Sequence, residues 1–221
     1  MIKQYTNSNW LKNLKLDLKL SDIQKDVLIG TILGDGYLRP SRSGKAARLQ
    51  ICHKAAVKEY VDWKYQIFKN LVFSEPRNQI QNNSLRFTTI SHPDLLEYLK
   101  YFYINSLKII PKNILDILKS SLSLAVWFMD DGNGYLDRDA YRISTYAFGL
   151  EGNLLLQECL KENFGLQVNF HRDSKGIQIY FPLKNGSALR FKNLIAPYVI
   201  PSMKYKIERR SPVETYMKGT R

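Results

Sequence analysis

The stretch LIGTILGDGY at residues 28–37 recurs in the second half of the chain as LAVWFMDDG at residues 124–132. In both copies an apolar run at helical spacing ends in an acidic residue that is followed by glycine, and Asp131 comes 96 residues after Asp35. Two copies of one supersecondary unit imply a pseudo-two-fold arrangement. The chain is therefore predicted to contain two structural repeats, each introduced by one of these helices.

The same order of predicted elements accompanies each of the two segments. Ser21 and Asp22 offer a cap for the first helix, which is expected to stop at Gly36. In each half the pattern then predicts a hairpin, a helix, a second hairpin and a helix. The later elements of the first half are expected at 37–39, 47–54, 55–71, 76–81, 85–90 and 93–104. Those of the second half are expected at 122–130, 135–136, 141–148, 150–164, 166–172, 177–181 and 187–195, which gives an α+β fold class with antiparallel sheets.

The composition is that of a folded, strongly basic protein. The chain has 221 residues, of which 44% are hydrophobic, and this excludes a mostly disordered polypeptide. Its 33 Lys and Arg residues outnumber 20 acidic residues, and the net charge of +13 favours a polyanionic partner such as nucleic acid or an anionic membrane surface. No uninterrupted apolar run approaches the roughly 20 residues that span a bilayer, so an intracellular protein outside the membrane is expected.

The cysteines and histidines give no sign of a clustered site. Cys52 and Cys159 form no CxxC pair, which argues against a disulfide framework and against structural zinc. The three scattered histidines are interpreted as structural or surface residues: His53, His92 and His171.

The predicted strands alternate between apolar and polar residues. In the strand at 47–54, Ala47, Leu49 and Ile51 share one face, because successive side chains point to opposite sides of a sheet. We expect the opposite, polar faces to bind nucleic acid, since Arg and Gln can read base edges and Lys neutralises phosphates. An ordinary solvated sheet face is the alternative. The candidate DNA-binding residues are Tyr37, Arg39, Arg48, Gln50, Lys54, Arg86, Thr88, Arg142, Ser144, Tyr146, Gln167, Asn169, His171, Gln178 and Tyr180.

The acids that end the two repeated segments predict a metal site. Asp35 and Asp131 stand at helix C-termini, where the helix dipole disfavours a carboxylate by a few tenths to about 1 kcal/mol. Both repeats make this choice, which suggests that a cation offsets it, and carboxylates with backbone carbonyls suit Mg²⁺. The alternative is that both motifs are simply turns after helices. Gly30 and Gly34 lie on one helix face and would let the two helices pack closely, bringing the acids together. A calcium loop starting at Asp130 is excluded, because the required Glu at its twelfth position is missing.

The two segments resemble the LAGLIDADG motif of the homing endonucleases, with Asp35 and Asp131 at the acidic eighth position. The resemblance covers about residues 22–207 and is to the single-chain, two-repeat type encoded in group I introns. It implies two pseudo-symmetric αββαββα repeats, motif helices at the repeat interface and antiparallel sheets that form a DNA-binding saddle. It also implies site-specific double-strand cleavage of a long asymmetric target across the minor groove. In this family Mg²⁺ is the cofactor, Mn²⁺ or Ca²⁺ can substitute for it in binding, and the products carry short 3′ overhangs.

The resemblance also assigns roles to further residues. Family members often carry one basic residue for each active site, and Lys108 and Lys206 match by their place in the segments KIIP (108–111) and IPSMKYK (200–206). Gln50 matches a polar position that helps organise solvent, and Ser144 is the candidate for its counterpart in the second repeat. Asp130 stands where the family name suggests a smaller or aliphatic residue, and is expected to be a helper or a carbonyl donor.

The expected domains are an N-terminal extension at 1–21, a first repeat at 22–118, a second repeat at 119–207 and a C-terminal tail at 208–221. The expected partner is double-stranded DNA, bound by a monomer. An RNA-binding maturase on the same fold, acting on its own intron RNA with or without cleavage, is the main alternative. A transcription regulator is less favoured, because no spare stretch of domain size lies outside residues 22–207. A two-carboxylate glycosidase is also disfavoured, since neutral sugars give no reason for the basic charge.

Overall fold

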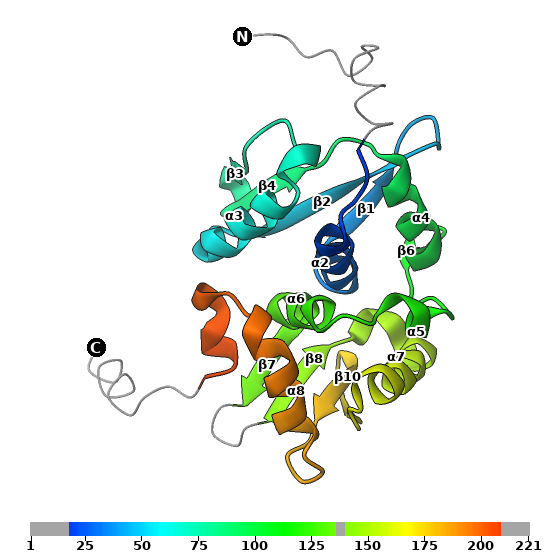
Figure 1. Ribbon diagram of the computed structural model, residues 1–221, viewed down its shortest axis with the longest axis vertical. Coiled ribbons are helices and arrows are strands. Elements are labelled where there is room, and N and C mark those ends of the chain that lie inside the picture. Colours follow the sequence, from blue (N-terminus) through cyan, green and yellow to red (C-terminus); the bar gives the residue numbers. More distant parts are fainter. Residues whose placement is uncertain (1–17, 136–139, 209–221) are drawn as a thin grey trace, which may run out of the picture.

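Two halves, each with helices and an antiparallel sheet, flank a central pair of helices in the computed structural model, which describes residues 18–135 and 140–208 (Figure 1). The central helices are α2 (Asp22–Leu33) and α6 (Ser121–Asp131), which pack against each other along their lengths. This arrangement confirms the α+β class and the placement of the repeated segments at the interface between the halves. Leu136, from the strand expected at 135–136, and the turn expected at 137–139 lie outside the described residues, as do most of the N-terminal extension and the C-terminal tail.

The first half contains one four-stranded sheet, the helices that cover it and a small two-stranded ribbon. Its strands are β1 (Tyr37–Pro40), β2 (Ala47–Lys54), β3 (Arg77–Gln79), β4 (Ser84–Thr88), β5 (Tyr103–Ile104) and β6 (Leu107–Lys108). Its helices besides α2 are α3 (Lys58–Ile67), α4 (Pro93–Phe102) and the 3-10 turns η1 (Ala55–Val57), η2 (Lys69–Leu71) and η3 (Ile80–Asn82).

The second half repeats this plan. Its strands are β7 (Gly132–Tyr135), β8 (Ala140–Ser144), β9 (Asn169–Asp173) and β10 (Gly176–Phe181). Its helices besides α6 are α5 (Ile114–Ile117), α7 (Gly149–Phe164) and α8 (Ser187–Ile195), with the 3-10 segments η4 (Tyr146–Phe148), η5 (Ala196–Tyr198) and η6 (Pro201–Lys206). Helix α5 packs on α7, although the predicted domain boundary places it in the first repeat.

The two sheets have the same topology. The strand orders are β1-β2-β4-β3 and β7-β8-β10-β9, and every pairing is antiparallel. Tyr37 pairs with Gln50 in the first sheet, and Asn133 pairs with Arg142 in the second. Tyr37 and Asn133 each follow the motif acid of their repeat by two residues, so their partners Gln50 and Arg142 hold corresponding positions in the two repeats. Three residues further along the chain in each repeat, His53 corresponds to Thr145.

The central helices are buried on nearly all sides. In α2 every residue from Val27 to Leu33 is buried, and in α6 every residue from Ser123 to Met129 is buried. A helix that is covered by both a sheet and a partner helix has no solvated face, which explains why neither segment shows a strongly one-sided apolar stripe. Helix α2 begins with the expected cap, because the Ser21 hydroxyl accepts from the Gln24 N–H while the Gln24 side chain accepts from the Ser21 N–H.

Several predicted elements end earlier than expected. The helix expected at 55–71 is divided into η1, α3 and η2, because the chain leaves the α-helical conformation at Phe68, a fully buried side chain. The strand expected at 141–148 ends at Ser144 and turns into η4. The helix expected at 93–104 ends at Phe102 and is followed by the ribbon of β5 and β6.

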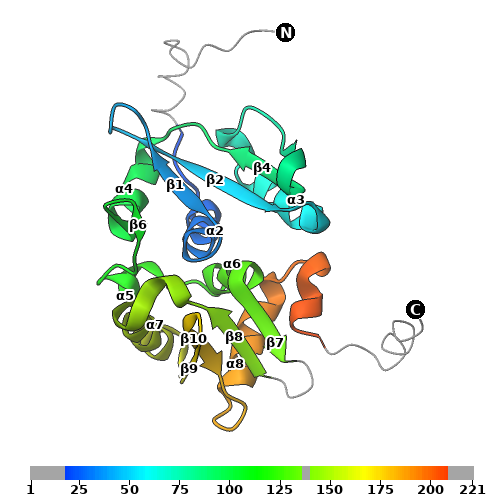
Figure 2. The same cartoon turned by 180° about the vertical axis from the view of Figure 1, so that it is seen from behind.

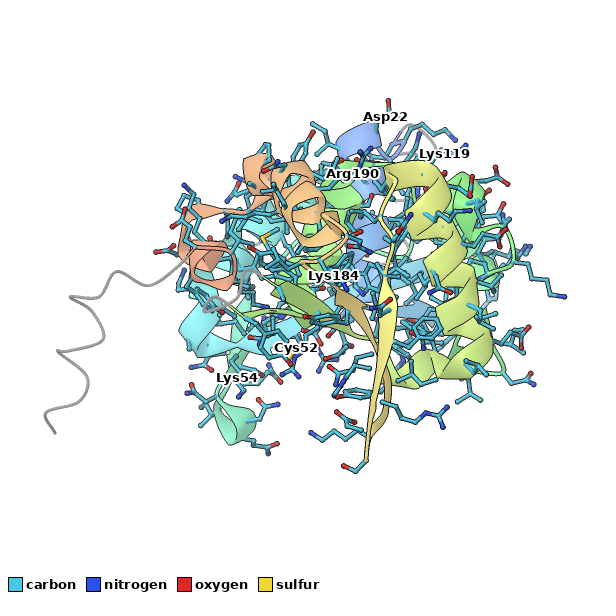
Figure 3. The ribbon with its side chains drawn as sticks, turned by 90° about the horizontal axis from the view of Figure 1, so that it is seen from below. Asp22, Cys52, Lys54, Lys119, Lys184 and Arg190 are labelled. Atoms are coloured by element: carbon cyan, nitrogen blue, oxygen red, sulfur yellow. The ribbon has the colours of Figure 1, made fainter. Side chains whose placement is uncertain are left out.

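The strands of both sheets lie on one side of the molecule, and Figure 2 shows β1, β2, β7 and β8 on the near side. In Figure 3, Cys52 and Lys54 from the polar face of β2 lie at one edge of the molecule, and Asp22 and Lys119 lie at the opposite edge. The expected apolar face of β2 is in the core, since Ala47, Leu49 and Ile51 are buried. No helix within residues 18–135 and 140–208 is long and apolar enough to cross a membrane.

Candidate active site and nucleic-acid interface

The two motif acids lie at the same end of the central helix pair. Asp35 follows Gly34, the C-cap of α2, and Asp131 is the last residue of α6. The helices approach closely at glycines, because a Cβ added to Gly30 would lie 2.3 Å from the Ser123 carbonyl oxygen. Helices α2 and α6 pack along their lengths, so Asp35 and Asp131 lie at one end of the same helix pair.

Each acid is accompanied by a lysine that bonds to the carbonyls beside it. The Lys108 ammonium donates to the carbonyl oxygens of Gly34 at 2.7 Å and Gly36 at 3.0 Å. The Lys206 ammonium donates to the Met129 carbonyl at 2.6 Å and, less closely, to the Asp130 carbonyl at 3.4 Å. These ammonium groups offset the negative potential at the two helix ends. The structure thus brings together four of the five residues that were predicted to take part in the chemistry, and the fifth, Gln50, lies on β2 opposite Tyr37.

Burial and nearby charges act on the ionisation of these groups. Burial, together with the charges of Asp35 and Asp130, raises the pKa of the Asp131 carboxyl to about 7. A hydrogen-bonding contact with His53 lowers the pKa of Asp35 below its usual value, and burial acts in the opposite direction. Burial lowers the pKa values of Lys108 and Lys206, although the nearby carboxylates oppose this effect. The two acids are therefore in different electrostatic environments.

His53 belongs to the site, contrary to its interpretation as a structural or surface residue. Its side chain is 8% exposed, and its Nδ1 atom lies 3.4 Å from the Asp35 carboxylate. His53 shares the core-facing parity of Leu49 and Ile51, but it lies near the end of β2 and reaches the end of the central helices. A single histidine in a strand gives no indication of this contact in the sequence.

Asp130 is buried in an ion pair. Its carboxylate accepts from the Lys64 ammonium at 2.7 and 3.0 Å and from the Tyr60 hydroxyl at 2.7 Å. The side chains of Asp130 and Lys64 are both 0% exposed. Asp130 and His53 lie close enough to Asp35 to form a group of possible metal ligands. The Asp130 oxygens already accept hydrogen bonds from protein donors.

The polar faces of the two sheets carry nearly all the predicted DNA-binding residues. Among them, Tyr37, Arg39, Arg48, Lys54, Gln167, Asn169 and His171 are exposed, and Gln50, Arg86, Thr88, Arg142, Ser144, Tyr146 and Tyr180 are half-buried. Gln178 differs from the expectation because it is buried, and its amide donates to the Asp173 carboxylate at 2.8 Å. Asp173 also accepts from the Tyr146 hydroxyl, so these side chains cover Gln178.

The second sheet carries a hollow of about 360 Å³ on this face, lined by Tyr135, Arg142, Asn169, Phe170, His171 and Tyr180. The Arg142 guanidinium lies over the Tyr135 ring, 5.0 Å from its centre. In the first sheet, the side-chain oxygen of Gln50 accepts a hydrogen bond from Arg86. By strand register Arg142, rather than Ser144, stands at the position that corresponds to Gln50.

A family model described as the LAGLIDADG DNA endonuclease family matches residues 25–189. The chain belongs to this family. The matched range includes both segments in which the sequence resembles the LAGLIDADG motif.

Individual relatives support the same assignment. The chain is 32% identical over 214 residues to the probable intron-encoded endonuclease 1 of Wickerhamomyces canadensis, which covers 91% of each chain. The structure described as the homing endonuclease I-WcaI bound to its DNA recognition sequence matches with a TM-score of 0.84 at 30% identity, over 95% of this chain and 97% of that one. This agreement confirms the single-chain LAGLIDADG architecture.

Other matches are to proteins with different names. Protein RecA of Mycolicibacterium flavescens is 30% identical over 202 residues, which are 86% of this chain and 47% of that protein. The chain therefore spans about half the length of the RecA proteins that it matches. The cytochrome b mRNA maturase bI2 of Debaryomyces hansenii is 26% identical, over 90% of this chain and 84% of that protein.

Proposed function

We propose that this LAGLIDADG protein is a site-specific endonuclease that cuts both strands of DNA with the help of Mg²⁺. The observation that carries the proposal is the pairing of Asp35 with Asp131 at one end of the central helices, each beside a lysine that bonds to its helix end. Two such centres, next to two sheets with polar faces, fit a reaction that occurs once on each strand of a duplex. Because such a substrate is genomic DNA, we place the activity inside the cell.

The donor set fits a hard divalent cation. Asp35 has a half-exposed carboxylate, and burial, together with the charges of Asp35 and Asp130, raises the pKa of Asp131, which a bound cation would offset. Asp35 and Asp131 would hold Mg²⁺, with Mn²⁺ or Ca²⁺ as substitutes in binding, since these ions prefer carboxylate oxygen. When bound, Mg²⁺ polarises a scissile phosphate and favours ionisation of water.

The remaining residues of the site act on charge and position. Lys108 and Lys206 fix the backbone next to the acids, and their ammonium groups can stabilise the extra negative charge that develops on a phosphate under attack. Gln50 pairs with Tyr37, two residues after Asp35, and can orient water, and we assign Arg142 the corresponding place in the second repeat.

The sheets would bind the duplex as one monomer. Exposed Arg and Lys side chains contact phosphates, while Gln, Asn and Tyr side chains and Arg142 can reach base edges in the major groove. The two sheets carry different residues at aligned positions, such as Gln50 and Arg142, so the two halves of the recognised site should differ in sequence. The proposal therefore includes a long, asymmetric target and short 3′ overhangs after cleavage.

Cleavage of a randomised DNA library, followed by sequencing of the ends, tests this function directly. The purified full chain with Mg²⁺ should enrich one long asymmetric sequence, cut in both strands with a fixed 3′ offset. A library that stays uncut with Mg²⁺ and with Mn²⁺, while the protein is folded, would refute the endonuclease.

Raising the salt concentration should weaken DNA binding steeply. A protein that neutralises about 6 to 10 phosphates loses about 10³- to 10⁵-fold in affinity between about 50 and 200 mM salt, because bound counterions are released. The slope of log affinity against log salt concentration reports the number of counterions released. Lys54→Gln should reduce the magnitude of this slope by about one, whereas Lys119→Gln at the opposite edge of the molecule should leave it unchanged (Figure 3). Fluorescence anisotropy with the selected site measures both effects, and a flat salt dependence would argue against the basic interface.

Stability should depend on pH through Asp131. Because its pKa is 3.8 in the reference state and about 7 in the folded protein, the folded state holds one extra proton between these values. Its contribution to the free energy of unfolding therefore falls as pH rises from about 4 to about 7, and is constant above that. A bound cation competes with this proton, so Mg²⁺ should raise the melting temperature more at about pH 8 than at about pH 5.5.

Differential scanning fluorimetry with and without Mg²⁺ measures this difference. Asp131→Asn should remove it, while Asp116→Asn, at a carboxylate that is 78% exposed, is the matched control and should retain it. Equal Mg²⁺ shifts at the two pH values would contradict the assignment of Asp131 to the cation.

A maturase activity is the second candidate, and the similarity to the Debaryomyces hansenii maturase supports it. In that case the chain would bind its own intron RNA and assist splicing, with or without DNA cleavage. A splicing assay of the host intron, with and without the purified chain, distinguishes this role from the endonuclease.

A further inference from the structure

The carboxylate of Asp130 belongs to the second repeat but is bound by the first. Asp130 lies on α6, whereas its partners Lys64 and Tyr60 lie on α3, 66 and 70 residues away in the chain. The Lys64 ammonium also lies over the Tyr60 ring, 4.5 Å from its centre. Burial, together with the charge of Asp130, raises the pKa of Tyr60 well above its usual value, so its hydroxyl remains a donor.

This contact needs a glycine on the facing helix. A Cβ on Gly34 would lie 2.4 Å from the Asp130 Cβ and 2.6 Å from its Oδ2 atom. Gly34 precedes Asp35 as Asp130 precedes Asp131, so the two residues hold the same motif position in different repeats. One repeat thus supplies the side chain and the other the space for it, and the arrangement cannot be two-fold symmetric.

The same carboxylate holds Asp35 in place. Asp130 Oδ2 accepts from the Asp35 main-chain N–H at 3.2 Å. His53 lies between the two acids, with Nε2 3.7 Å from Asp130 Oδ1 and Nδ1 3.4 Å from Asp35 Oδ2. The Lys64 ammonium is 3.4 Å from the same Nε2 atom. Asp35 is therefore fixed at its main chain by Asp130 and contacted at its carboxylate by His53.

Asp131 has no equivalent support within the part of the chain that the structure describes. The residue of the first repeat that corresponds to Asp130 is Gly34, which has no side chain. The residue of the second repeat that corresponds to His53 by strand register is Thr145. Thr145 is buried and bonds to Asn153 and to the Ile177 carbonyl instead of to an acid. Among residues 18–135 and 140–208, none donates a hydrogen bond to the Asp131 carboxylate.

We propose that Asp130 and Lys64 form a positioning pair for Asp35 alone, so that the two cleavage centres of this protein are built differently. This inference rests on the proposed endonuclease function. Misplacement of a reacting group by about 1 Å can cost about 10²-fold in rate. Loss of the pair should therefore slow the cut that depends on Asp35 and largely spare the cut that depends on Asp131.

Strand-specific cleavage of a duplex with a different label on each strand tests this difference. The nicks left by Asp35→Asn and Asp131→Asn first show which strand depends on which acid. Asp130→Ala combined with Lys64→Met removes the acceptor of the Asp35 N–H without leaving a lone buried charge. We expect this double variant to slow the Asp35-dependent cut by about 10- to 100-fold and the other cut by less than about 3-fold.

Two further variants separate positioning from general stability. Asp130→Asn combined with Lys64→Met keeps an oxygen that can accept from the Asp35 N–H, and should recover most of the lost rate. Ser123→Ala removes another hydrogen bond between the repeats, which the Ser123 hydroxyl donates to the Asp26 carbonyl at 2.8 Å. This control should show no difference between the strands, because Ser123 lies at the other end of the helix pair.

Hydrogen exchange in the protein without DNA or metal gives a readout independent of cleavage. The amide of Asp35 should exchange faster in the variant that combines Asp130→Ala with Lys64→Met than in the wild type. It should exchange at an intermediate rate in the variant that combines Asp130→Asn with Lys64→Met, because an amide oxygen then replaces the carboxylate as acceptor. Equal slowing of both strands, or unchanged exchange at Asp35, would overturn the positioning role. A wild type that cuts neither strand would count against the endonuclease, while the exchange result would still decide the role of Asp130.

Discussion

Asp35→Asn and Asp131→Asn should each abolish double-strand cleavage while leaving DNA affinity nearly unchanged. The amide keeps the size of the carboxylate but removes the negative charge that would hold Mg²⁺. The metal supplies several kcal/mol of charge stabilisation, and each 1.36 kcal/mol is tenfold in rate, so the loss at the affected strand should be on the order of 10³-fold. Conversion of supercoiled plasmid to nicked and linear forms measures it.

Affinity and a distant acid provide the controls for these two variants. Anisotropy with the uncut site should give dissociation constants within a few-fold of the wild type, since neither acid lies on the polar sheet faces. Asp116→Asn, at an exposed carboxylate on α5, should linearise the plasmid at the wild-type rate. Linear product at an undiminished rate from either Asp35→Asn or Asp131→Asn would show that the acid is not part of the reaction.

Gly30→Ala should destabilise the protein and disable cleavage together. The added Cβ would meet the Ser123 carbonyl oxygen at 2.3 Å and the Val126 Cβ at 2.7 Å, and the backbone atom cannot turn away. Overpacking of a dense interior costs about 1 to 3 kcal/mol, occasionally more. For a chain of this size, the melting temperature should fall by about 2 to 4 °C per kcal/mol.

The same substitution would force the central helices apart, and the acids at the ends of these helices would move with them. Cleavage should therefore fall more than the loss of folded protein explains, and this is measured below the melting temperature of the variant. Ile23→Ala, on the same helix at a side chain that is 57% exposed, is the control and should leave both quantities nearly unchanged. A Gly30→Ala protein with wild-type melting and cleavage would show that the helices are not tightly packed there.

The sequence alone was sufficient to predict the features that occur in both repeats and those that depend on neighbouring residues. The two motif helices, the alternation of β2 and the cap at Ser21 depend on residues close together in the chain, and each is confirmed. The repeated order of elements also predicted two halves of equal topology, because the sheet orders follow from the hairpins in each half. Element ends were less accurate, as at Phe68, where the backbone leaves the α-helical conformation within the helix expected at 55–71.

Apart from the packing of the two motif helices, the sequence did not predict contacts between the halves. Asp130 was expected to be a helper or a carbonyl donor, and its partner Lys64 is 66 residues away, beyond any local pattern. One signal was available, because Lys64 stands among apolar residues on one face of the helix expected at 55–71. A lysine is almost never fully buried unless it is paired, so this position indicated an acidic partner without identifying it. His53 gave no such signal.

The Asp130 side chain fills the space that Gly34 leaves on the facing helix, and this fit has a consequence for how the two halves can pair. Two copies of the first half would leave Lys64 without a counter-ion, and two copies of the second would set Asp130 against another Asp130, so both self-pairings bury uncompensated charge. We therefore expect neither half to form a stable homodimer. Chimeras that join halves of different relatives should therefore carry Gly34, Tyr60, Lys64 and Asp130 as one transferable set.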